Sequence, residues 1–226
     1  MTSEAAYTLE RVIYRLGSTY GFQELTAMFV PAPDLKVRWQ RGSGFAELQI
    51  PDFLDDAPEE VLEEFIRGLL ERMSGNAYTE GQTVCDWLTR PEFCSENQKT
   101  YLSRNENILG KAEGRHRNLN ESLKRLREAG LVGDIPGLFI SWMSGESDLK
   151  ICRSTVLMKV AAVNDILDAE DTPDFVLDYC LYDAIAPLIA GYLPDGSGEI
   201  QKRKLMRKFK QSKEAEQWIK AEGLLL

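Results

Sequence analysis

The residues with the clearest chemical potential lie in the helical pattern of residues 173–190. Positions 183 and 187 are four apart, so a helix presents their side chains on one face. A zinc-binding helix of the hydrolytic type carries histidines at two such positions and a glutamate directly after the first. Here the three positions hold Asp183, Ala184 and Pro187, and the whole chain contains one histidine, His116. Two imidazoles therefore cannot bind one zinc ion in this chain.

The substitutions at these three positions remove each part of metal-assisted hydrolysis. Asp183 by itself is a weak metal ligand, and Ala184 has no group that could accept a proton from a water molecule. Pro187 has no ligand atom, and it removes the helical hydrogen bond to the carbonyl of Asp183, which predicts a kink. We therefore predict no catalytic residue, no metal ligand and no cofactor.

The elements that must position this helix can be predicted from periodicity. Thr172 suits the N-cap of the helix, and Pro173 and Asp174 suit its first two positions. We also expect a short strand at residues 138–142 and a longer strand at residues 156–163. Upstream, the pattern predicts helices at residues 5–16 and 118–130, and a strong helix that starts at Pro58 and is ended by Gly75. It also predicts a β-hairpin at residues 35–50 and an irregular stretch at residues 76–117 that is apolar enough for short packed helices. From the sequence we expect no internal repeat.

The order of these elements and several short motifs resemble the SprT-like and YgjP-like zinc metallopeptidases, above all their archaeal members. The matching segments are Ile140–Trp142, Leu157–Val160, Val163–Asn164, Leu167–Asp168, Pro173–Tyr182 and Glu214–Trp218, with weaker matches at Leu35–Trp39 and Asp56–Val61. The resemblance implies a His-Glu-x-x-His motif at positions 183–187 and a third ligand downstream in active members. This chain departs from that pattern at both histidines and at the glutamate, and no histidine follows His116.

The predicted fold is α+β and zincin-like, with a small antiparallel sheet packed on helices and a degenerate active-site helix. We expect an N-terminal α+β region at residues 1–117, containing the hairpin and an irregular insert, and a zincin-like core at residues 118–226.

A second candidate feature is a basic segment near the C-terminus. It contains seven cationic residues and no acidic one: Lys202, Arg203, Lys204, Arg207, Lys208, Lys210 and Lys213. Such a cluster can bind a phosphate backbone or an acidic protein surface, and it is also compatible with an ordinary solvated helix face.

Charge and cysteine usage narrow the function classes. The net charge of −9 argues against general attraction to nucleic acid or to an anionic membrane, although a local basic patch remains compatible with it. The longest apolar run, residues 184–193, is far shorter than the ~20 residues that span a bilayer. With no signal-like N-terminus and scattered cysteines, we expect a cytoplasmic protein with reduced thiols. A structural zinc site from Cys85, Cys94 and His116 would need a fourth ligand and matches no common spacing.

Three functional hypotheses follow. The first is a catalytically inactive relative of a zinc metallopeptidase that binds a protein or peptide, with residues 156–163 as the strand that an extended peptide would join. The second is an accessory protein that binds nucleic acid or a ribonucleoprotein through residues 202–213. The third is a hydrolase with a remodelled site that uses Asp183 and a downstream acid such as Glu199.

Overall fold

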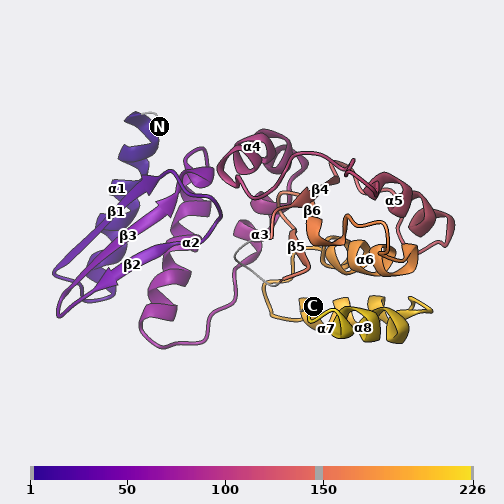
Figure 1. Ribbon diagram of the computed structural model, residues 1–226. Coiled ribbons are helices and arrows are strands. Elements are labelled where there is room, and N and C mark those ends of the chain that lie inside the picture. Colours follow the sequence, from indigo (N-terminus) through magenta and orange to yellow (C-terminus); the bar gives the residue numbers. More distant parts are fainter. Residues whose placement is uncertain (1–2, 146–149, 225–226) are drawn as a thin grey trace. The chain divides into compact units, whose positions relative to one another are not determined.

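The structure is a computed structural model that describes residues 3–145 and 150–224, and the chain forms two compact units, Met1–Arg90 and Pro91–Leu226 (Figure 1). The sequence predicts a division after residue 117 instead. The difference arises from helix α4 (Pro91–Arg104), which packs within the second unit. There the Tyr101 hydroxyl lies 2.7 Å from the Thr155 hydroxyl, and the Gln98 amide donates to the Met158 carbonyl.

The first unit combines a three-stranded sheet with helices. Its elements are α1 (Ser3–Thr19), β1 (Glu24–Val30), β2 (Arg38–Arg41), β3 (Phe45–Pro51), the 3-10 turn η1 (Asp52–Leu54), α2 (Glu59–Met73) and α3 (Gln82–Thr89). The hairpin expected within residues 35–50 is present as the antiparallel pair β2–β3, and β1 adds a parallel strand on the other side of β3. Alternate β3 residues, Ala46, Leu48 and Ile50, are buried.

The second unit is built around helix α6 (Asp174–Ala190). Its other elements are α4, α5 (Leu119–Glu128), β4 (Phe139–Met143), β5 (Cys152–Thr155), β6 (Val160–Asn164), the 3-10 turn η2 (Asp165–Leu167), α7 (Gly198–Met206) and α8 (Ser212–Ala221). The strand order is β4-β6-β5, with β4 parallel and β5 antiparallel to β6. The sheet is therefore mixed, and the prediction of an antiparallel sheet is wrong in this respect.

Helix α6 is surrounded by protein. It packs against β5 and β6 and also contacts α5, α7 and α8 (Figure 1). Its residues are apolar on nearly every side, as expected of a helix that is buried all round. The helix continues through Pro187 to Ala190, and it begins after Pro173 rather than with Thr172 as the N-cap. Within residues 3–145 and 150–224, no helix is long and apolar enough to cross a membrane.

The two units share one topology, which contradicts the expectation of no internal repeat. Each runs helix, strand, strand, strand, 3-10 turn and helix, through α1 to α2 in the first unit and α5 to α6 in the second. In both sheets the third strand is central, parallel to the first and antiparallel to the second.

A short sequence repeat accompanies the shared topology. The first unit reads Asp-Phe-Leu-Asp from Asp52 and Pro-Glu-Glu-Val-Leu from Pro58, while the second reads Asp-Ile-Leu-Asp from Asp165 and Pro-Asp-Phe-Val-Leu from Pro173. In each case the first block forms the 3-10 turn and the proline precedes the helix. The connecting loops differ in length by two residues, which conceals the repeat in the sequence.

Candidate functional site

The centre of the candidate site is a partly buried ion pair between α6 and α7. Asp183 is 8% exposed, and its Oδ2 lies 2.8 Å from Nζ of Lys202 on α7. The same oxygen accepts a hydrogen bond from the thiol of Cys152 on β5, at 2.9 Å. Three elements of the second unit thus converge on one carboxylate, and Cys152 is a member that no sequence motif indicated.

The electrostatics of this cluster favour a protonated thiol and a charged ammonium. Burial, and then the negative charge of Asp183, raise the pKa of Cys152 well above its ordinary value. Burial would lower the pKa of Lys202, but the hydrogen bond and charge of Asp183 outweigh it and raise that pKa. The thiol is therefore a hydrogen-bond donor at neutral pH, and the ammonium neutralises the carboxylate.

The repeat shows that this cluster belongs to the second unit alone. Asp183 is the tenth residue of α6, and the tenth residue of α2 is Gly68. A Cβ atom at Gly68 would meet a ring carbon of Tyr78 at 2.1 Å, so any larger residue at this position would have to displace that ring. The ionic group is thus a feature that distinguishes α6 from its counterpart.

The other two positions compared with a zinc-binding motif have no polar group in their side chains. Ala184 is buried, and Pro187 lines a hollow of about 310 Å³ together with Val156 and Lys202. Among the described residues, no three histidine, cysteine, aspartate or glutamate side chains are close enough to bind one metal ion. Glu199, proposed as a second acid, lines the same hollow, while the carboxylate of Asp183 is paired with Lys202.

A second hollow, of about 450 Å³, lies where α6, α7 and α8 meet. Its lining combines tyrosine, serine, methionine, three cations and three acids, namely Tyr179, Asp183, Glu199, Lys202, Arg203, Met206, Arg207, Ser212 and Glu216. The Tyr179 hydroxyl donates to Oε1 of Glu216 at 2.8 Å, which links α6 to α8. Lys202 and Glu199 line both hollows, so the two are neighbours.

The strand predicted to accept a peptide is placed differently by the structure. Residues 156–159 form a turn, and β6 is the central strand, with neighbours on both sides and all five residues buried. Its backbone is already paired with β4 and β5, so residues 156–163 cannot accept another strand. The edge strands are β4 and β5.

The outer edge of β4 is covered by the segment that precedes α5. The Leu109 amide donates to the Trp142 carbonyl, the Trp142 amide donates to the Lys111 carbonyl, and both distances are 2.9 Å. Ile108 also forms a bridge with Met143. The other edge strand of this sheet is β5. Among the described residues, no backbone segment pairs with its outer side.

Register identifies the free groups of β5. The backbone amide of Asn164 donates to the Ile151 carbonyl at 2.7 Å. These two residues lie opposite each other in the register of β5 and β6, so they form a hydrogen-bonded pair of the ladder. Because hydrogen-bonded and non-bonded pairs alternate in an antiparallel ladder, the backbone groups of Cys152 and Ser154 point away from β6. Within the described part of the chain, these groups form no backbone hydrogen bond on that side.

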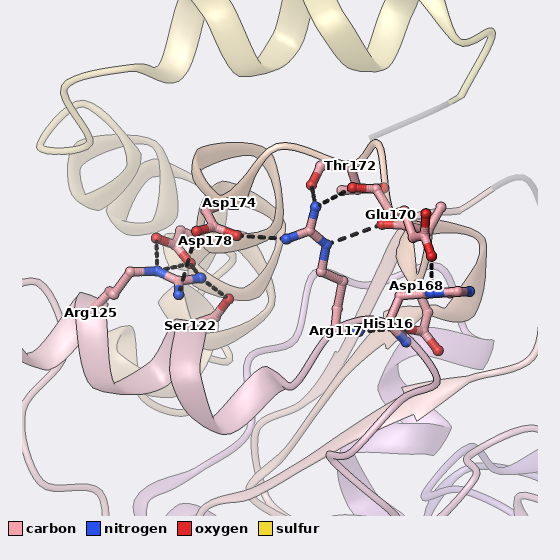
Figure 2. Close-up of polar contacts among 10 residues, drawn as sticks. His116, Arg117, Ser122, Arg125, Asp168, Glu170, Thr172, Asp174 and Asp178 are labelled. Atoms are coloured by element: carbon pink, nitrogen blue, oxygen red, sulfur yellow. Dashed lines mark hydrogen bonds and ion pairs between the residues drawn. The ribbon is translucent and has the colours of Figure 1, made fainter.

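A polar network holds the start of α6 in place. Both carboxylate oxygens of Asp168 accept backbone hydrogen bonds from residues 115–117. The Arg117 guanidinium donates to the carbonyls of Ala169, Glu170 and Thr172 and pairs with Asp174 at 2.9 Å (Figure 2). The loop before α5 and the loop before α6 are therefore joined, and sequence reasoning assigned no such role to Arg117.

One turn along α6, a second arginine fixes the helix to α5. The Arg125 guanidinium binds Asp178 through two nitrogens, at 2.7 and 2.8 Å, and also donates to the hydroxyl of Ser122 (Figure 2). Bidentate arginine–carboxylate pairs fix orientation as well as distance. This pair and the Arg117 network define the direction in which α6 presents Asp183.

The predicted basic segment does not act as one surface. Lys202 points inward to Asp183, whereas the other six cations, Arg203, Lys204, Arg207, Lys208, Lys210 and Lys213, are exposed. Arg203 and Arg207 line the 450 Å³ hollow. In the described part of the chain, none of these six has an acidic partner within ion-pair distance.

The resemblance to zinc metallopeptidases stays a prediction from the sequence. No protein family, curated protein or solved structure matches the chain.

Proposed function

We propose that the chain is a non-catalytic relative of the SprT-like and YgjP-like zinc metallopeptidases that binds an extended protein or peptide segment along β5. The observation that carries this proposal is the open edge of β5 beside Asp183. An extended peptide can add to such an edge through main-chain hydrogen bonds, while nearby pockets receive alternate side chains.

The chemistry at the degenerate positions supports binding rather than hydrolysis. Asp183 is neutralised by Lys202, Ala184 has no proton acceptor, and Pro187 has no ligand atom. A metal-activated water needs open coordination positions and a nearby base, which these residues do not supply. Peptide hydrolysis by pure protein that a chelator abolishes would contradict the proposal.

The strand-addition step can be tested with a proline at Ser154. Because the Ser154 amide points away from β6, proline removes a donor to the ligand without removing a bond within the sheet. Ser154→Ala keeps the amide and serves as the matched control. We expect Ser154→Pro to weaken binding of a fluorescein-labelled Val-Thr repeat peptide by about fivefold, as loss of one backbone hydrogen bond predicts. Equal affinity of the two variants would contradict strand addition.

A nucleic-acid partner is the second candidate, favoured by the six exposed cations, which have no acidic partner among residues 3–145 and 150–224. Binding to phosphate would release counterions and weaken steeply with salt. Measuring RNA affinity between 50 and 200 mM salt tests this candidate, and a flat salt response would exclude it.

A further inference from the structure

The charges around the 450 Å³ hollow are unequally compensated. Asp183 is neutralised by Lys202, and Glu216 accepts the hydroxyl of Tyr179. Glu199 lies in the first turn of α7, where the helix dipole favours a negative charge. Arg203 and Arg207 are exposed, line the hollow and have no acidic partner in the described part of the chain.

These two guanidinium groups are well placed to act together. Arg203 lies on α7, and Arg207 is the residue that follows its last turn. Because the two are four residues apart, their side chains project from the same face of the helix. The ammonium of Lys202 has three N–H donors, and Asp183 is its one described hydrogen-bond partner. The hollow therefore offers donors from three neighbouring cations to an anionic group.

The surroundings favour a carboxylate over a nucleic-acid strand. Phe209 is buried and packs against Tyr179 and Tyr182, at ring-centroid distances of 5.4 and 6.1 Å. These rings are therefore not available for the base stacking that single-stranded nucleic acid uses.

The hollow can be reached from the open edge of β5. Val156, which follows β5 directly, lines the neighbouring 310 Å³ hollow together with Lys202. Lys202 in turn lines the hollow that contains Arg203 and Arg207. A peptide that continued past the end of β5 into the first hollow would therefore run toward these cations.

We infer that the 450 Å³ hollow is an anion-binding pocket in which Arg203 and Arg207, with Lys202, bind a carboxylate of an acidic peptide. The position of the peptide backbone on β5 rests on the proposed function. The pocket adds selectivity for acidic sequence next to the β5-bound segment, because guanidinium groups bind carboxylates through paired hydrogen bonds.

The test uses three fluorescein-labelled peptides with the same Val-Thr repeat and a tail of three Glu, three Gln or three Lys residues. Affinity is measured by anisotropy for the full chain, for Arg203→Gln/Arg207→Gln, and for Lys204→Gln/Lys213→Gln. The second pair changes the net charge equally at exposed positions outside the pocket. Circular dichroism establishes that each variant is folded.

We expect the Glu-tailed peptide to bind at least about tenfold tighter than the Gln-tailed peptide, as loss of a charged hydrogen bond predicts. The arginine variant should lose this preference, and the lysine variant should keep it within about twofold. Equal binding of the Glu and Gln tails, both weakened by Ser154→Pro, would overturn the anion pocket and leave the proposed function standing. If Ser154→Pro leaves the affinities of both peptides unchanged while the Glu tail is still preferred, the pocket is retained and strand addition is overturned.

A single-stranded RNA 20-mer distinguishes the remaining class of ligand. If RNA displaces the Glu-tailed peptide, and both double variants weaken RNA and peptide equally, general cationic attraction explains the binding. That result would overturn the assignment to a carboxylate. RNA that fails to compete supports it.

Discussion

Lys202 and Asp183 lie on consecutive helices, and their charged groups are 2.8 Å apart in a setting where 11% of the Asp183 side chain is exposed. The ammonium compensates the carboxylate at the position where the resemblance would place a zinc ligand. A buried carboxylate needs either a partner or a proton, and in this chain the partner comes from the protein itself.

Removing Lys202 should destabilise the protein more than removing the charge of Asp183. Lys202→Met leaves the carboxylate buried with only a thiol donor, whereas Asp183→Asn leaves an ammonium whose side chain is 26% exposed and can reach water. Since one partner is partly exposed, we expect Lys202→Met to lower the free energy of unfolding by about 2 kcal/mol, below the range for fully buried pairs.

Urea unfolding of both variants and of the double variant measures this asymmetry. The double variant Lys202→Met/Asp183→Asn should recover part of the loss, because no uncompensated charge remains. Equal losses for the two single variants would contradict the burial argument.

Asp168 should make stability depend on pH in the acid range. Burial would raise its pKa, but hydrogen bonds from the backbone amides of residues 115–117 outweigh this effect and lower it. A carboxyl group with a lowered folded-state pKa stabilises the protein above the unfolded-state pKa of about 3.9, and this contribution is lost as the pH falls through the folded-state value.

The measurement compares wild type with Asp168→Asn by urea unfolding between pH 2 and pH 7. We expect Asp168→Asn to be less stable by about 1 kcal/mol above pH 5, with the difference disappearing toward pH 2. Asp171→Asn, in the same loop and exposed, is the control and should track wild type. A difference that stays constant with pH would refute this account.

The thiol of Cys152 should react slowly as long as residue 183 carries the negative charge of an aspartate. Burial and the Asp183 charge raise its pKa, and the thiolate is the reactive form. Asp183→Asn removes the negative charge, so Cys152 should alkylate faster with iodoacetamide at pH 8, as read by peptide mass spectrometry. Cys94, whose pKa is raised by burial, is the internal reference and should keep its rate. An unchanged rate at Cys152 would argue against the thiol–carboxylate contact.

Local patterns were sufficient to predict several elements. The apolar stripe after Pro58 became α2, and the Leu119, Leu123 and Leu126 spacing became the buried face of α5. Helix α6 was predicted within a residue or two at its start, since proline and an acidic residue mark helix N-termini. Periodicity is a local property, so elements that depend on it can be read from the chain.

Pairing could not be predicted in the same way. Apolar residues at 156–163 suggested one long strand, but β6 begins at Val160 and is central, while the short strand β5 forms the edge. Whether a strand lies at the edge or in the centre of a sheet depends on which segments meet in space. A continuous apolar run is also typical of a central strand that is buried on both faces. The repeated topology could not be seen in the sequence either, because the matching sequence is limited to two short blocks at unequal spacing.

By itself the sequence determined that two imidazoles cannot bind zinc here and that positions 183, 184 and 187 hold Asp183, Ala184 and Pro187 instead of a His-Glu-x-x-His motif. Composition and spacing suffice for that conclusion because it concerns which chemical groups exist. Only the tertiary structure decided that Asp183 pairs with Lys202 and Cys152, and that Lys202 turns away from the basic segment. Both contacts depend on burial. A carboxylate that is removed from water needs hydrogen-bond donors, and the fold supplies them from residues that can lie far apart in the sequence.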